Sequence, residues 1–304
     1  MVKKKKNKYQ DSNFINQIEQ YISYLRVERH YAANTISAYQ RDLSNLFDFC
    51  LKNKISETSA IDSDILNLFV MELRHKAISS KSIRRYLSSI RGFLDYLVKE
   101  EILTENNAKN IQSPKISHSL PKTIDFDDLK RLISVQSNDY LELRSIAMIE
   151  VMYSCGLRVS ELVNLNISDM DLSEGFLRVK GKGGKMRFSP IGNGAIKSIK
   201  SYLAKRPNTD TEALFVNNND DRISPRSVQN TVKVRAIEVG ISVNVHPHML
   251  RHAAATHFLQ SSHDLRSVQE FLGHKSIKST QVYTHLDFLE LSKVYDEFHP
   301  RAKK

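Results

Sequence analysis

Four successive segments in the first hundred residues repeat their apolar side chains with the period of an α-helix. In each segment the apolar residues recur at spacings of three and four, which places them on one face of an amphipathic helix. The segments span residues 14–25, 36–50, 65–73 and 83–97. Asp62 or Ser63 is a suitable N-cap for the third helix. Together these patterns predict a four-helix domain over residues 11–108, preceded by a basic tail at residues 1–10.

A polar segment separates this domain from the rest of the chain. Residues 109–121 contain two prolines and lack a helical period, which predicts an interdomain linker. Helical periods return at residues 125–135, 140–153, 194–205, 225–238, 248–260, 264–272 and 286–298. Two strand-like segments, 176–179 and 186–190, flank a glycine-rich turn and predict a β-hairpin. We therefore expect residues 122–304 to form a second domain, mainly α with a small β-sheet.

The balance of charge points to a polyanionic partner. The formal net charge is +11 and the pI is about 9.5. A soluble basic protein without a polyanionic partner could have the same charge. No apolar run approaches the ~18 residues of a membrane span, and the N-terminus lacks a signal-peptide core, so we expect a cytoplasmic, nucleoid-associated protein with no membrane partner. Cys50 and Cys155 are expected in the core, and no Cys/His cluster has zinc-ligand spacing. We predict neither a metal nor a cofactor.

The fourth predicted helix is basic on the side that its apolar face leaves exposed. The residues concerned are Lys81, Arg84, Arg85 and Arg91. They either solvate the helix or lie against DNA phosphates, since lysine and arginine are common contacts of the phosphate backbone. The sequence leaves both interpretations open.

Six residues of the second domain indicate a catalytic site only when they are considered together. They are Arg158, Lys182, His248, Arg251, His274 and Tyr283. Taken singly, each has an ordinary explanation, such as a local ion pair of Arg158 with Glu161 or a solvated hairpin tip at Lys182. The set lacks the clustered carboxylates that hold Mg²⁺ or Ca²⁺. Two arginines can instead hold the oxygens of a phosphodiester, a tyrosine can attack phosphorus, and a lysine can protonate the departing oxygen.

The segments around these residues resemble the catalytic domain of the tyrosine recombinase family, and in particular the Xer recombinases of bacteria. The matching motifs are GLRVSEL at Arg158, GKGGK at Lys182, HMLRH at His248 and Arg251, LGHKS at His274, and TQVYTHL at Tyr283. The interval of nine positions from His274 to Tyr283 is also that of the family. Each motif alone is weak, but the combined pattern is specific.

The resemblance implies a covalent mechanism. Tyr283 attacks the scissile phosphate and forms a 3′-phosphotyrosyl bond, Lys182 protonates the leaving 5′ oxygen, and His248 assists proton transfer at the tyrosine. The partner strand then attacks the phosphotyrosine, and two such rounds pass through a Holliday junction. The reaction needs neither ATP nor a metal, because the covalent link keeps the bond energy.

The resemblance also assigns supporting roles and an architecture. Arg158, Arg251 and His274 stabilise the transition state, while Glu161 either orients Arg158 or merely forms a helix ion pair with it. The first domain is similar to the family's core-binding, SAM-like domain, which closes a C-shaped, two-domain clamp on DNA. The apolar helix at residues 286–298 either packs on its own domain or docks on a neighbouring subunit, as in the family.

The implied partners are a double-stranded DNA recombination site and further recombinase subunits, in a homo- or hetero-tetramer on two DNA sites. An FtsK-type translocase is implied as activator, and resolution of chromosome dimers at cell division as the role. Three alternatives stay open: an integrase or excisionase of a phage or mobile element, an inactive DNA-binding descendant, and a type IB topoisomerase. The short segment before the first helix favours the Xer interpretation, and the complete set of six residues argues against an inactive descendant.

Overall fold

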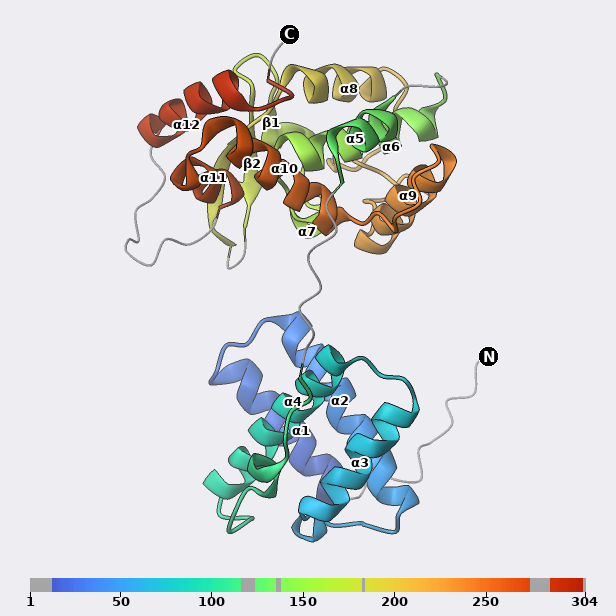
Figure 1. Cartoon of the computed structure of the whole chain (residues 1–304), viewed down its shortest axis with the longest axis vertical. Coiled ribbons are helices and arrows are strands. Elements are labelled where there is room, and N and C mark those ends of the chain that lie inside the picture. Colours follow the sequence, from blue (N-terminus) through green and yellow to red (C-terminus); the bar gives the residue numbers. More distant parts are fainter. Residues whose placement is uncertain (1–12, 116–123, 135–137, 182–183, 274–284, 303–304) are drawn as a thin grey trace. The chain divides into compact units, whose positions relative to one another are not determined.

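The computed structural model describes residues 13–115, 124–134, 138–181, 184–273 and 285–302, without the side chains of residues 285–290. The chain divides into two compact units, Met1–Ser119 and Leu120–Lys304. Each unit has its own hydrophobic core. The helices of both units and the small sheet of the second are drawn in Figure 1. The described elements are helices apart from one small sheet, which confirms the predicted fold class.

Within residues 13–115, the described part of the first unit, there are four α-helices, as the apolar periods predicted. They are α1 (Asn13–Val27), α2 (Ala33–Lys52), α3 (Ser63–His75) and α4 (Ser80–Lys99). Asp62 caps α3, because its side chain accepts a hydrogen bond of 2.8 Å from the backbone N–H of Ile65. The apolar faces meet in one core, where the rings of Phe14 and Phe93 stack with their centres 6.1 Å apart.

Two short 3₁₀ helices, η1 (Thr58–Ala60) and η2 (Asn107–Asn110), complete the first unit and were not predicted. Asn106 fixes the start of η2: its side-chain oxygen accepts a 3.0 Å hydrogen bond from the N–H of Ala108, and its amide donates to the carbonyl of Arg91 at 2.9 Å. Ala108 and Ile111 are buried in the helical core. The chain therefore remains packed on the four helices as far as Ile111.

One buried helix, α6 (Tyr140–Ser154), organises the second unit. All of its residues from Ile146 to Ser154 are buried, so neighbouring elements enclose this part of the helix on every side. Its helical neighbours include α5 (Phe126–Ile133), α8 (Asn193–Leu203), α9 (Pro225–Glu238) and α10 (Pro247–Ser262), which Figure 1 shows.

A tight turn leads from α6 into the short helix α7 (Val159–Val163). Gly156 in this turn has φ +56°, a left-handed conformation that favours glycine. An added Cβ at this position would lie 2.6 Å from Cε1 of Phe271, so the close approach of α11 (Leu265–Leu272) also requires glycine.

The sheet has three antiparallel strands in the order β1 (Met170–Asp171), β2 (Phe176–Lys180), β3 (Met186–Pro190). β2 and β3 confirm the predicted hairpin, whereas the two-residue strand β1 was not predicted. Val179 of β2 pairs with Arg187 of β3. The backbone N–H of Gly181 donates to the carbonyl of Lys185 at 2.8 Å, which closes the hairpin at its turn.

The C-terminal segment packs on the second unit itself. Helix α12 (His285–Phe298) contacts α10, α11 and β3. Tyr295 is fully buried, and its hydroxyl lies 2.7 Å from Oγ of Ser154. Beyond the helix, Arg301 forms an ion pair with Glu150 of α6. The structure thus shows α12 on its own unit, and docking on a neighbouring subunit stays a prediction.

Two further expectations concern the cysteines and the membrane. Cys50 and Cys155 are both buried with free thiols, as predicted. Within the described ranges, no helix combines the length and apolar character needed to cross a membrane.

Candidate active site

Arg158 immediately precedes α7 and is paired with Glu161 of that helix. The backbone N–H of Arg158 donates to Oε2 of Glu161 at 2.9 Å, and Nη1 of Arg158 donates to Oε1 at 2.8 Å. One carboxylate therefore binds both a free N–H at the start of the helix and the guanidinium. The Glu161 side chain is 3 % exposed and that of Arg158 is 36 % exposed. Glu161 thus fixes Arg158 through its backbone and guanidinium, while part of the Arg158 side chain stays exposed to solvent.

Arg251, on the second turn of α10, joins the segments that carry two other predicted site residues. Its Nη1 donates to the carbonyl of Gly156, two residues before Arg158. Its Nη2 donates at 2.6 Å to the carbonyl of Leu272, two residues before His274. Arg251 is buried, and its Nη1 lies 3.7 Å from Oε2 of Glu161. A guanidinium has more N–H donors than these two hydrogen bonds use, so Arg251 keeps donors for a further acceptor.

Arg187 of β3 is a third arginine at the same carboxylate, and the sequence did not single it out. Its Nη2 lies 3.3 Å from Oε2 of Glu161, and its side chain is 7 % exposed. The signal that could have found it is the hairpin register, because Arg187 pairs with the buried Val179 and so shares its inward face. An arginine at an inward position requires an anionic partner.

These three arginines and Glu161 are called the arginine cluster below. Burial raises the pKa of Glu161, but Arg187 and Arg158 outweigh burial and hold that pKa below its usual value. Burial lowers the pKa of Arg251 to about 10, and Arg158 acts in the same direction while Glu161 opposes it. At neutral pH the cluster therefore holds three cations and one anion. Its excess positive charge suits a phosphodiester.

The structure describes only part of the remaining predicted site. His248 is exposed in the first turn of α10, one turn before the buried Arg251. Lys182, His274 and Tyr283 lie outside the described residues. Gly273, immediately before His274, adopts φ +63°, and an added Cβ there would lie 2.8 Å from Cδ of Arg187.

The basic residues of α4 divide into two groups. Lys81 and Arg84 are exposed. Arg85, in contrast, donates from Nη1 at 2.6 Å to both carboxylate oxygens of the buried Asp42. Arg91 donates to the carbonyls of Ala108 and Ile111 and to Oγ of Ser113, which ties α4 to the segment after η2. Of the four, Arg85 and Arg91 are thus engaged with other protein groups, whereas Lys81 and Arg84 are the more exposed.

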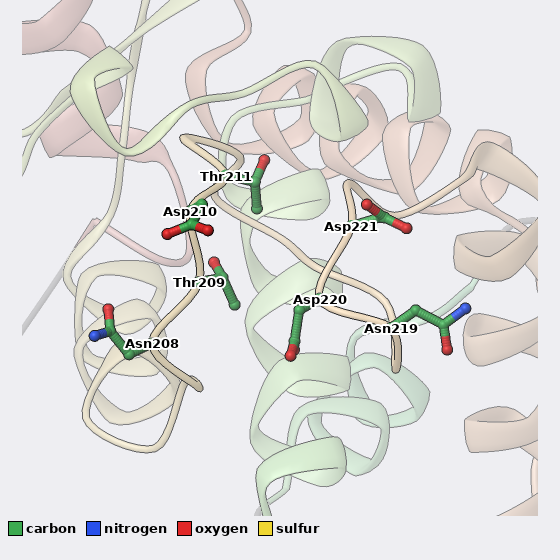
Figure 2. A pocket seen from close by; sticks show the side chains of 7 residues that line it. All are labelled: Asn208, Thr209, Asp210, Thr211, Asn219, Asp220 and Asp221. Carbon is green, nitrogen blue, oxygen red and sulfur yellow. The ribbon is translucent and has the colours of Figure 1, made fainter.

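A hollow of about 510 Å³ lies elsewhere in the second unit, between two polar loops (Figure 2). It is lined by Asn208, Thr209, Asp210, Thr211, Asn219, Asp220 and Asp221. Its three carboxylates would repel a phosphate, and no member of the arginine cluster lines it. Among the described residues, no group of three or more His, Cys, Asp or Glu side chains could hold a metal ion. The hollow is therefore no part of the predicted phosphodiester chemistry.

Both units match known families. Residues 122–290 match the phage integrase family, and residues 18–101 match the SAM-like N-terminal domain of phage integrases. The chain is 44 % identical over 289 residues to the tyrosine recombinase XerC of Shigella flexneri serotype 5b (strain 8401). That match covers 94 % of this chain and 97 % of the relative.

The fold is shared with solved structures of recombinases, including the following two. One is the XerH site-specific recombinase bound to a palindromic difH substrate in a post-cleavage complex, with a TM-score of 0.67 and 24 % identity. The other is a lambda integrase tetramer bound to a Holliday junction, with a TM-score of 0.67 and 16 % identity. Each match covers 93 % of this chain and 86 % of the other.

Proposed function

This chain belongs to the phage integrase family and is a Xer-type tyrosine recombinase, and we propose that it resolves chromosome dimers by exchanging DNA strands at a specific site. The observation that carries the proposal is the identity to a XerC protein along nearly the whole of both chains. The arginine cluster supports it, because Arg158, just before α7, and Arg251, on α10, converge on one carboxylate.

In this proposal the arginine cluster holds the scissile phosphate. Arg158 and Arg251 donate hydrogen bonds to the non-bridging oxygens, whose negative charge grows as phosphorus is attacked. Glu161 does not neutralise the cluster, since it is one carboxylate among three guanidinium groups. The two backbone carbonyls that bind Arg251 fix the guanidinium before DNA arrives, so little reorganisation is needed during the reaction.

Tyr283 is the proposed nucleophile. Its oxygen forms a bond to phosphorus, the bond from phosphorus to the 5′ oxygen breaks, and Lys182 gives a proton to that leaving oxygen. His248 is proposed to assist in removing the tyrosine proton, and its exposure in the first turn of α10 leaves it accessible for that task. His274 is proposed to donate a further hydrogen bond to the phosphate.

The proposed reaction proceeds without ATP or a metal ion. The phosphotyrosyl bond keeps the energy of the broken phosphodiester, so the 5′ hydroxyl of the partner strand can attack it directly. The arginines supply the positive charge that a metal ion supplies in other phosphoryl-transfer sites. Two rounds of cleavage and joining would carry the DNA through a Holliday junction.

The proposed assembly is a tetramer of recombinase subunits on two double-stranded DNA sites. Lys81 and Arg84 of α4 are proposed to contact phosphates, since both are exposed. Docking of α12 on a neighbouring subunit and activation by an FtsK-type translocase are further parts of the proposal. The alternative role, excision or integration of a mobile element, has the same chemistry and differs in the DNA site.

Recombination of a defined plasmid tests the role. The plasmid carries two direct repeats of the host's chromosome-dimer site, and the chain is added alone and with the host's second recombinase. We expect excision of the intervening DNA with the wild-type chain and none with Tyr283→Phe. A chain that recombines the attachment site of a mobile element and leaves the chromosome-dimer site intact would contradict the chromosomal role.

A further inference from the structure

Arg187 contacts the Glu161 carboxylate, which also lies beside Arg158 and Arg251. Oε1 of Glu161 accepts a hydrogen bond from Nη1 of Arg158 at 2.8 Å. Oε2 accepts one from the backbone N–H of Arg158 at 2.9 Å and one from Nη2 of Arg187 at 3.3 Å. Nη1 of Arg251 lies 3.7 Å from this same Oε2. Arg187 and Arg251 therefore both approach one oxygen atom, and Arg187 is the nearer.

Arg187 is enclosed by protein and is no candidate to bind DNA itself. Its side chain is 7 % exposed, and Gly273 lies directly on it, since an added Cβ there would be 2.8 Å from both Cδ and Nε. Its Nε is buried without a hydrogen-bond partner among the residues that the structure describes. A bulky ligand such as a phosphodiester cannot reach a guanidinium that is covered in this way.

We propose that Arg187 is a positioning residue, which holds Glu161 on Arg158 and keeps Arg251 from forming a closer ion pair with the Glu161 carboxylate. This inference rests on the proposed recombinase function. Without Arg187, Oε2 of Glu161 would lose one of its two hydrogen-bond donors, and Arg251 would be the next cation within reach. A closer ion pair with Glu161 would then draw the Arg251 guanidinium toward the carboxylate and weaken its hydrogen bonds to the phosphate.

The position of Arg187 in the fold gives this role a second consequence. Arg187 lies on β3, which follows the hairpin segment that contains Lys182. Its side chain also contacts Gly273, the residue before His274. One side chain thus contacts the helix start at Arg158 through Glu161 and the end of α11 through Gly273. Substitution of Arg187 should therefore slow cleavage more than it weakens DNA binding.

The test uses the full chain and a nicked suicide DNA substrate that traps the covalent adduct. For each variant we would measure DNA affinity by fluorescence anisotropy, the single-turnover rate of adduct formation, and thermal unfolding. Arg187→Met should slow adduct formation by about 10- to 100-fold, by analogy with the loss of residues that orient the ligands of a metal site. DNA affinity should change by less than about threefold, and Arg187→Lys should recover part of the rate because it keeps the charge.

A double-mutant cycle separates positioning from loss of structure. If Arg187 acts through Glu161, Arg187→Met should slow a Glu161→Gln chain by no more than about threefold further. Arg235→Met is the matched control, because Arg235 is also a buried arginine but pairs with Glu142, 3.1 Å away, and bonds to the carbonyl of Leu132. We expect this control to lose stability and to keep the wild-type cleavage rate.

Three outcomes would overturn the inference. They are a wild-type rate in Arg187→Met, full independence of Arg187→Met and Glu161→Gln, and equal slowing by Arg235→Met. Each requires that the wild-type chain forms the adduct, so each contradicts the role of Arg187 and leaves the proposed function intact. Absence of the adduct in the wild-type chain would overturn both.

Discussion

Arg301 and Glu150 form a buried ion pair that fastens the C-terminal residues to α6. Nε of Arg301 lies 3.1 Å from Oε2 of Glu150, and Nη2 donates to Oε1. The Glu150 side chain is 2 % exposed, whereas that of Arg301 is 27 % exposed. Gly192 and Gly194 permit the approach, since an added Cβ at either position would overlap Arg301. Arg301→Met removes the cation and keeps much of the side-chain length.

The loss of free energy follows from the burial of Glu150. Breaking a buried pair by removing one partner costs about 3–5 kcal/mol, because the other charge is left uncompensated. Burial already raises the pKa of Glu150, and Arg301 opposes that shift. Without Arg301 the folded-state pKa rises further above its unfolded value of about 4.3, so the folded state binds a proton more readily. The destabilisation should therefore be largest above neutrality and shrink on acidification.

Urea and thermal unfolding at about pH 8 and about pH 5.5 check this prediction. At the higher pH a loss of about 4 kcal/mol corresponds to a fall in Tm on the order of 10 °C for a domain of this size. Arg266→Met is the control, because Arg266 is 87 % exposed and its pair with Glu270 should contribute less than about 1 kcal/mol. A loss below about 1 kcal/mol for Arg301→Met, or an equal loss at both pH values, would contradict this prediction.

The remaining predictions concern the first unit and the buried His299. Arg84→Met should lower the slope of DNA affinity against salt concentration by about one, on logarithmic scales, and leave the free energy of unfolding unchanged. Arg85→Met should instead lower the free energy of unfolding by about 3 kcal/mol, because it leaves Asp42 buried without its cation. Fluorescence anisotropy across a salt series and urea unfolding test these two variants. A wild-type salt slope in Arg84→Met would contradict the phosphate contact of Arg84. Burial lowers the pKa of His299 to about 3, so its contribution to stability is complete above the unfolded value of about 6.5 and is lost as pH falls toward 3. His299→Phe keeps an aromatic ring against Tyr295. In this variant the free energy of unfolding should fall less steeply below about pH 6.5. The same pH dependence as in the wild type would exclude His299 as its cause.

The elements that could be predicted from the sequence are those whose pattern lies within one short segment of the chain. The amphipathic period of α1 to α4 and the glycine-rich turn between β2 and β3 each reside in one short stretch of chain. The two-residue strand β1 and the 3₁₀ helices η1 and η2 carry too few residues to show a period. Their positions depend on contacts with distant segments, such as the hydrogen bonds of Asn106 with α4.

The arginine cluster was predictable only in part, for the same reason. Arg158 and Glu161 are three residues apart, so spacing alone suggested their ion pair. Arg187 is 26 residues from Glu161, and only the folded hairpin brings the two together. Arg85 likewise reaches Asp42 on another helix, 43 residues away, which no pattern within α4 could reveal. A lone arginine in a sequence therefore does not show whether it faces a partner strand, a carboxylate or DNA.

The most direct test of the account is formation of a covalent protein–DNA adduct. The substrate is a suicide DNA, nicked near the crossover of the host's chromosome-dimer site, and the reaction contains no added metal or ATP. We expect a denaturation-resistant adduct with the wild-type chain and none with Tyr283→Phe, at equal DNA binding. An adduct that persists in Tyr283→Phe, or tight binding without any adduct even when the host's second recombinase is added, would contradict this expectation.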